Sequence, residues 1–374
     1  MIRRIVNTII ISVIALAAKA QTDSIVAPAD TLPPLSGNWI QQLMQVNYRI
    51  NDPRIRYPKF ANFCRKVYNW GDHTFNTYDP NYVVGTGKNW KTYIKSYNWL
   101  QTYAYLFGMF NHDNAIRLHT KMNSDLGVSL NFMAVSIGYT WNVNRWMSNV
   151  RDDRSSFNFA FTCSLFSAEL MTWRSRGDGY LTKFGNYQAP GNQKFSFLLP
   201  GGVDQSAFNI NAYYFFNNKK YSQSAAYHYS KYQKRSAGTW LIGLSFNQQK
   251  INIDFSSLPE DVRLAVPELP LKNHYEYQDY NLMGGYAYNC VMPHNWLYNI
   301  TVLPSFGYKR SHLVEKGTKE MLAANMQMKM SMTYNHRALF ASGIIRFDGG
   351  LIFKKDYAFF NAMESVTILV GMRF

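Results

Sequence analysis

Long runs of strict two-residue alternation constrain the fold of this chain more than any other feature. Successive side chains of a β-strand point to opposite faces of the sheet. The segment 322–334 therefore predicts a strand whose apolar face is Leu322, Ala324, Met326, Met328, Met330, Met332 and Tyr334 and whose polar face is Asn325, Gln327, Lys329, Ser331 and Thr333. Such runs exceed the ~5–6 residues of an ordinary sandwich strand and suit the ~9–11 residues of a tilted membrane strand.

The N-terminus has the pattern of a secretory signal peptide. Arg3 and Arg4 form a basic start, an apolar stretch follows over 5–18, and Ala18-Lys19-Ala20 offers a small-residue cleavage site before Gln21. The apolar stretch is shorter than the ~20 residues of a spanning helix. We therefore predict export, with residues 1–20 as a signal peptide cleaved near Ala20-Gln21.

The C-terminal strand alternates up to its final residue. Val370, Met372 and Phe374 form an apolar face that ends in an aromatic, which suggests the recognition signal of the outer-membrane barrel assembly machinery. Aromatic residues make up 16% of the chain, as expected where they form the lipid face and interfacial girdles of a barrel. We predict an all-β, antiparallel transmembrane barrel in the cell outer membrane. The alternative is a soluble sandwich whose terminal Phe374 has no such role.

The barrel is expected to contain about twelve strands, with ten as the alternative. An even count places both termini in the periplasm. Residues 21–58 are predicted as an extended periplasmic leader, 59–75 as a short amphipathic helix and 88–374 as the barrel. The expected strands are 88–107, 125–141, 155–174, 179–187, 204–216, 219–231, 236–252, 274–290, 294–308, 318–334, 337–353 and 359–374.

The net charge of +16 indicates an anionic partner. Lipopolysaccharide and other outer-membrane lipids are the expected partners. Nucleic acid is not, because the basic residues are scattered and the chain is exported. Cys64, Cys163 and Cys290 are far apart and suggest no disulfide framework. No motif indicates a metal or another cofactor.

Several polar residues share the inward parity of their strands and are candidates for lining the lumen. Basic residues among them would favour anions. They could instead pair with carboxylates or with a helical plug. These candidates are Asn325, Gln327, Lys329, Ser331 and Arg373.

Two segments resemble a known family. They are Tyr78-Asp79-Pro80-Asn81-Tyr82-Val83 with the following Gly87-Lys88-Asn89-Trp90, and the stretch 214–243, which contains Phe216-Asn217 and Gln233-Lys234-Arg235-Ser236-Ala237-Gly238. Together they resemble a domain-of-unknown-function family of outer-membrane proteins from Bacteroidota-type bacteria. The resemblance implies a barrel in the outer membrane and carries over no catalytic residue.

The sequence leaves three functions open. The leading one is a small channel or binding barrel for polar or anionic solutes. The second is a hydrolase acting on outer-membrane lipid, although the chain has no Gly-x-Ser-x-Gly or His-Glu-x-x-His motif. The third is a structural or adhesive barrel whose long extracellular loops, such as 254–273, bind a partner.

Overall fold

The computed structural model describes residues 33–46, 49–107, 115–132, 134–143, 153–188, 195–264, 271–311, 320–353 and 357–374. The predicted signal peptide at 1–20 and its cleavage site lie outside these ranges.

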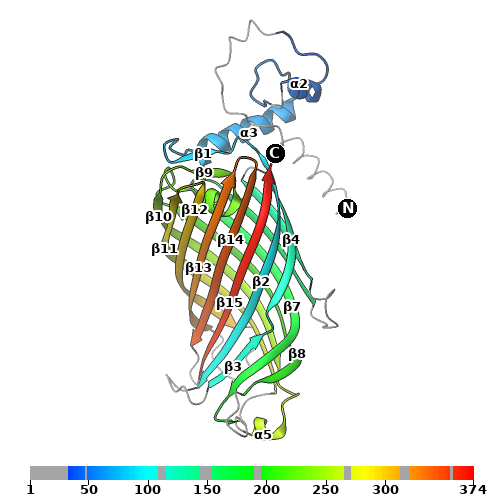
Figure 1. The fold of residues 1–374 in the computed structure, drawn as a ribbon, viewed down its shortest axis with the longest axis vertical. Coiled ribbons are helices and arrows are strands. Elements are labelled where there is room, and N and C mark those ends of the chain that lie inside the picture. Colours follow the sequence, from blue (N-terminus) through cyan, green and yellow to red (C-terminus); the bar gives the residue numbers. More distant parts are fainter. Residues whose placement is uncertain are drawn as a thin grey trace.

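The described strands form a closed antiparallel barrel (Figure 1). The main sheet has thirteen strands, of which twelve close the ring because the last, β15, pairs with β2 from Lys91↔Arg373 to Phe107↔Tyr357. The ring consists of β2 (Trp90–Phe107), β4 (Asn123–Phe132), β5 (Val135–Asn142), β6 (Asp153–Thr162), β7 (Phe166–Phe184), β8 (Phe197–Phe215), β10 (Ala237–Asp254), β11 (Lys272–Met292), β12 (Trp296–Ser311), β13 (Glu320–His336), β14 (Leu339–Phe353) and β15 (Tyr357–Arg373). The predicted fold class and strand number are confirmed.

Outward and inward side chains separate as the alternation predicts. On β10, the side chains of Trp240 and Leu244 point outward, and each is 66% exposed. Thr239 and Leu241, on either side of Trp240 in the sequence, point inward and are buried. The exterior therefore carries an apolar belt, and ring closure pairs the backbone groups of every strand with a neighbour. A bilayer demands both features of a spanning barrel. The protein is thus an outer-membrane β-barrel.

The number of strands in the wall changes along the barrel axis. Near the end that carries the C-terminus, β2 pairs with β4 and β7 pairs with β6. Near the other end, the short strand β3 (Ala115–Thr120) pairs with both β2 and β7. Because β3 alone replaces β4, β5 and β6, the wall has twelve strands in its periplasmic half and ten in its extracellular half.

The correct strand number arose from errors that cancel. The segment 125–141 contains parts of two strands, β4 and β5. The segment 155–174 contains parts of β6 and β7, which are joined at a tight turn where the Cys163 amide donates to the Phe166 carbonyl. The expected strand 179–187 is instead the end of β7, and 219–231 does not join the wall. The segment 188–202 lies between two expected strands and would then run in the periplasm. Instead, β7 and β8 are joined at the end opposite the C-terminus, and 197–202 belong to β8. Alternation continues from β4 into β5 and from β6 into β7, so the sequence pattern does not reveal where one strand ends and the next begins.

The N-terminal part is more structured than the expected extended leader. Helix α2 (Trp39–Gln45) begins at an Asn38 capping box, and its Leu43 packs with Val46 and Ile55. Helix α3 (Lys59–Phe75) lies across the end of the barrel that carries the C-terminus (Figure 1). In the part of the chain that the structure describes, no helix has both the length and the apolarity to cross a membrane.

We expect the apolar belt to tolerate charge poorly. Leu244→Arg places a cation on the lipid face of β10 and should lower the free energy of unfolding by about 2–4 kcal/mol, the usual cost near the middle of a bilayer. Asn252→Arg, on the same face but eight residues nearer the extracellular end, should cost roughly 0–1 kcal/mol. Guanidinium unfolding in lipid vesicles measures both. Equal losses of unfolding free energy in the two variants would contradict the view that the membrane boundary lies between positions 244 and 252.

Candidate functional site

The connection between β8 and β10 folds back into the barrel. Residues 217–236, hereafter the lumenal plug, contain the π-helix η4 (Ser224–His228) and β9 (Lys231–Gln233), which pairs with β1 (Val83–Gly85). The inward wall side chain of Asn289 donates to the Ser222 carbonyl over 2.9 Å, and Arg373 Nε donates to the Tyr229 carbonyl over 2.8 Å. The plug is therefore bonded to strands around the periplasmic opening.

Local sequence explains why the plug leaves the wall. Asn217 donates its amide to Thr239 Oγ1 and its Nδ2 to the Gly238 carbonyl, which closes the β8–β10 hairpin before the plug begins. The run Ser222–Ala226 consists of small residues and Gln223, which fit a narrow lumen. Tyr229 then adopts φ 58°, a left-handed conformation that ends η4, and its ring stacks on Phe340 with centroids 4.5 Å apart.

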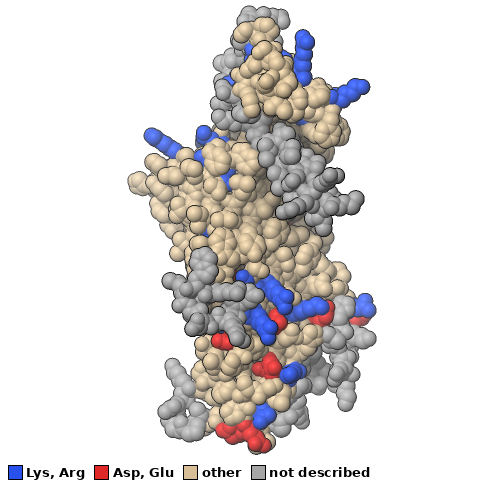
Figure 2. Space-filling model, turned by 90° about the vertical axis from the view of Figure 1, so that its right-hand side faces the viewer, with Lys and Arg blue, Asp and Glu red and all other residues tan. Residues whose placement is uncertain are grey.

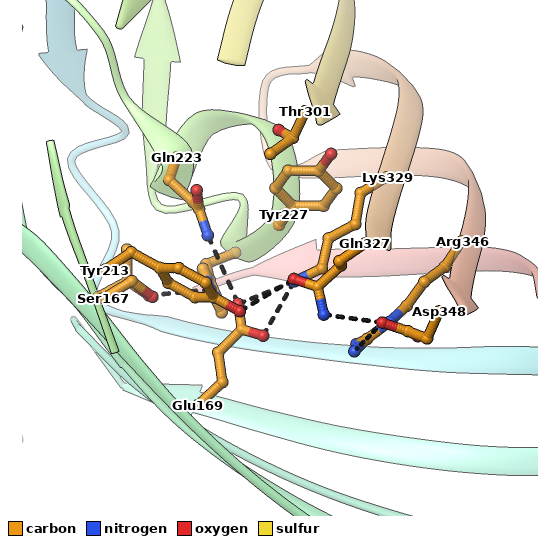
Figure 3. A network of polar contacts seen from close by, with 12 residues as sticks. Ser167, Glu169, Tyr213, Gln223, Tyr227, Thr301, Gln327, Lys329, Arg346 and Asp348 are labelled. Carbon is orange, nitrogen blue, oxygen red and sulfur yellow. Dashed lines mark hydrogen bonds and ion pairs between the residues drawn. The ribbon is translucent and has the colours of Figure 1, made fainter. Parts of the chain in front are cut away.

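An ion pair crosses the lumen beneath the plug (Figure 3). Lys329 Nζ on β13 lies 2.9 Å and 3.2 Å from the two carboxylate oxygens of Glu169 on β7. These strands are five steps apart around the ring, so the two side chains meet across the interior. Gln223 of the plug also donates to Glu169, over 3.4 Å. The pair joins opposite walls to each other and to the plug.

A second set of bonds crosses the lumen beside this pair. Tyr213 Oη on β8 donates to Gln327 Oε1 on β13 over 3.1 Å, and Gln327 Nε2 donates to Asp348 on β14 over 2.7 Å. Arg346 holds the same carboxylate, with Nη2 3.0 Å from Asp348 Oδ1. Each charged group in this network has an opposite charge within reach, which offsets the cost of removing it from water.

A cavity of about 110 Å³ lies in the middle of the lumen, between inward side chains of β2, β7, β8 and β10 to β15. Its lining is mainly polar and includes Asn281, Lys309, Arg346, Asp348 and Asn361. Asn361 reaches across the interior to Tyr277 Oη over 3.1 Å. A cavity of this size holds a few water molecules and is not a continuous passage.

The extracellular half of the lumen is filled by apolar side chains. This outer seal is a single buried cluster to which the ten-stranded part of the wall contributes inward residues, including Tyr103, Leu118, Leu181, Ile251 and Phe359. Leu258 and Val262, from the connection that contains α5 (Glu260–Arg263), complete the cluster.

Helix α5 lies at the end of the barrel opposite the C-terminus (Figure 1). Tyr187 Oη donates to Asp261 over 3.1 Å, and this carboxylate raises the pKa of the Tyr187 hydroxyl. The bond joins the β7–β8 connection to the lid that α5 forms.

The structure places the five lumen-lining candidates as follows. Lys329 and Gln327 belong to the cross-lumen network, and Asn325 donates to Asn281 over 3.0 Å. Ser331 donates to the Ala226 carbonyl of the plug over 3.3 Å, and Arg373, 1% exposed, holds the Tyr229 carbonyl. Each therefore contacts the plug or another inward side chain.

Sequence reasoning missed the partners Glu169 and Tyr213 of this network. Glu169 is the single carboxylate of the expected strand 155–174, which otherwise has the pattern of a membrane-spanning strand. An ionisable residue in such a place is rare and usually paired, so this signal could have found it.

The C-terminal residues face the lipid side. Val370, Met372 and Phe374 are 62%, 46% and 49% exposed, and the backbone of Phe374 exchanges two hydrogen bonds with Trp90. The proposed assembly signal is thus an outward apolar row on the strand that closes the ring.

Among the described residues, no group of three His, Cys, Asp or Glu side chains lies close enough to hold a metal ion. His228, in the plug, lies 3.0 Å from Thr162 Oγ1 and belongs to the packing of η4. The geometry supports closure of the lumen.

The fold and the interior define a class: an outer-membrane β-barrel with a plug inside its lumen. The chain belongs to the family described as "Domain of unknown function (DUF4421)", which matches residues 77–374. No curated protein matches the sequence.

Solved outer-membrane barrels are similar only in outline. The outer membrane protease OmpT from Escherichia coli is 9% identical, with 76% of this chain and 97% of that chain covered and a TM-score of 0.30. The translocator domain of the autotransporter NalP from Neisseria meningitidis is 9% identical, with 84% and 96% covered and a TM-score of 0.36. The anion-selective porin from Comamonas acidovorans is 8% identical, with 78% and 99% covered and a TM-score of 0.24. These scores carry no argument about activity.

The ion pair across the lumen yields a stability prediction. Lys329→Met leaves the Glu169 carboxylate without its main partner in the interior and should lower the free energy of unfolding by about 3–5 kcal/mol. The double variant Glu169→Gln with Lys329→Met removes both charges and should recover most of that loss. Guanidinium unfolding of the single and double variants in vesicles measures the coupling. Additive losses would show that the two side chains do not interact.

Proposed function

We propose that this protein is a closed barrel that does not conduct solutes at rest and presents its extracellular end as a binding surface. The observation that carries the proposal is that the lumen is blocked at three levels. The lumenal plug fills the periplasmic end, the pair Glu169–Lys329 bridges the middle, and the outer seal fills the ten-stranded half.

The extracellular half supports a role at the cell surface. Strands such as β7, β8 and β11 have 19, 19 and 21 residues, about twice the ~9–11 that a membrane strand needs. The short strands β4, β5 and β6 stop where the wall narrows, so the longer ones continue beyond the membrane. This projecting part has its own apolar core in the outer seal, as a compact domain would.

A gated channel for small polar or anionic solutes is the second candidate. It is favoured by the polar character of the middle of the lumen, where Lys309 pairs with Asp279 at 3.1 Å beside the pair of Arg346 and Asp348. An inert core would be filled more simply by apolar side chains. In this reading the lumenal plug is the gate, since it is attached mainly through hydrogen bonds.

Planar-bilayer recording separates the two candidates. The wild-type chain should show no conductance above that of the bare bilayer. A variant in which a short glycine-containing turn replaces residues 218–236 should also remain closed, because the outer seal is intact. A heat-dependent shift in gel mobility confirms folding of each preparation, and a general porin provides the positive control.

The other outcomes are equally informative. Steady conductance of the plug-replaced variant alone would contradict the closed barrel and support the gated channel. Steady conductance of the wild-type chain would contradict closure of the lumen altogether.

A further inference from the structure

A groove of about 480 Å³ lies on the outer face of the wall, outside the lumen. Outward side chains of five consecutive strands, β5 to β8 and β10, form it. Tyr139 and Phe157 line one part, and Arg174, Asp204, Ser206 and Lys250 line another, so that two cations and one carboxylate face the groove. The groove is thus apolar at one end and polar at the other.

The groove spans the edge of the apolar belt. On the same strands, the outward residues nearer the periplasm are Ile137, Phe159 and Ile210, which are exposed to the lipid side. The outward residues nearer the cell exterior include Arg176, whose register partner Asp204 lines the groove itself. This change from apolar to charged side chains marks the height at which outer-leaflet headgroups lie.

Basic side chains gather at this height. Figure 2 shows the side of the wall on which β4, β7 and β8 lie. Lys and Arg side chains collect below the middle of the wall, with Asp and Glu side chains among them, while few charged side chains appear on the wall surface above. An accumulation of cations at the headgroup level complements anionic lipid.

Two cations face the groove from either side of β8. Arg174 and Lys250 are both register partners of Ser206, so their strands are separated by two interstrand spacings, about 10 Å. Lys250 also pairs with Glu276 at 2.8 Å and its side chain stays 48% exposed. Among the side chains that the structure describes, Arg174 has no ion-pair partner. A guanidinium without an ion-pair partner can present its planar set of N–H donors to a phosphate.

From this geometry we propose that the groove binds the phosphorylated sugar headgroup of an outer-leaflet glycolipid. Arg174 holds the phosphate, Lys250 provides the second positive charge, and Ser155, Ser206 and Asn252 offer hydroxyl and amide groups to the sugar. The acyl chains lie along the apolar wall beside Tyr139 and Phe157. This site is on the opposite face of the wall from the lumenal plug, so it does not depend on whether the lumen conducts.

Binding of purified lipid A to the full chain in detergent tests the proposal. Bisphosphorylated lipid A and its dephosphorylated form are the two probes, and native mass spectrometry counts the bound lipid. The variant Arg174→Gln with Lys250→Gln should weaken binding of the bisphosphorylated form by about 10-fold or more, as expected for lost charge-assisted hydrogen bonds. Binding of the dephosphorylated form should change little.

The matched control is Arg117→Gln, which removes an exposed cation from β3 outside the groove and should leave binding of both probes unchanged. Arg174→Lys, which keeps the charge but loses the planar donors, should give an intermediate loss and serves if the double variant folds poorly. Equal losses in control and groove variants, or equal binding of both lipid forms, would overturn the proposal. Competition by inorganic phosphate without any preference for lipid would show a free-anion site instead.

Discussion

The width of a twelve-stranded wall is the constraint on which the interior of this barrel depends. Barrel diameter grows with strand number, and 16–18 strands leave an open aqueous channel. Here opposite walls are close enough for side chains to meet, as Glu169 and Lys329 do. Inward charges at this depth pair with an opposite charge, on another strand as Lys329 does with Glu169 or on the same strand as Arg346 does with Asp348. Such pairing offsets the cost of removing the charges from water. The narrow width thus supports the proposed closure of the lumen.

The three levels of closure divide the inward residues by chemistry. At the periplasmic end, small polar wall residues hold the backbone of the lumenal plug. In the middle, long charged and amide side chains bridge the walls. In the extracellular half, where β3 replaces three strands, the narrower lumen is filled by aromatic and aliphatic side chains. The segment 214–243 that suggested a known family contains the plug. Its residues are thus occupied in closing the barrel.

The two-residue alternation predicted the structure correctly where a single strand produces it. It failed where a pair of strands with a tight turn, or the lumenal plug, produces the same alternation. Alternation and the C-terminal row ending in Phe374 predicted the barrel and its location. The turn at Cys163–Leu165 escaped because alternation continues through it. The plug was mistaken for a strand because Tyr227, Tyr229 and Lys231 alternate with polar residues. Two features of the sequence argued against a strand at this place. They are the small residues from Ser222 to Ala226 and the adjacent Lys219 and Lys220, which suit neither a lipid face nor a membrane strand. Contacts across the lumen depend on strand register, which no local pattern contains.

Hydrogen exchange of the lumenal plug in lipid nanodiscs tests closure most directly. Amides of residues 221–233 are buried among wall side chains and several are hydrogen-bonded, so they should be protected for hours, comparably to the strands that surround them. The exposed residues 256–257 beside the lid provide an internal reference for rapid exchange. Exchange of the plug amides within seconds, at the rate of that reference, would show that residues 217–236 do not occupy the lumen and would contradict the account of a closed barrel.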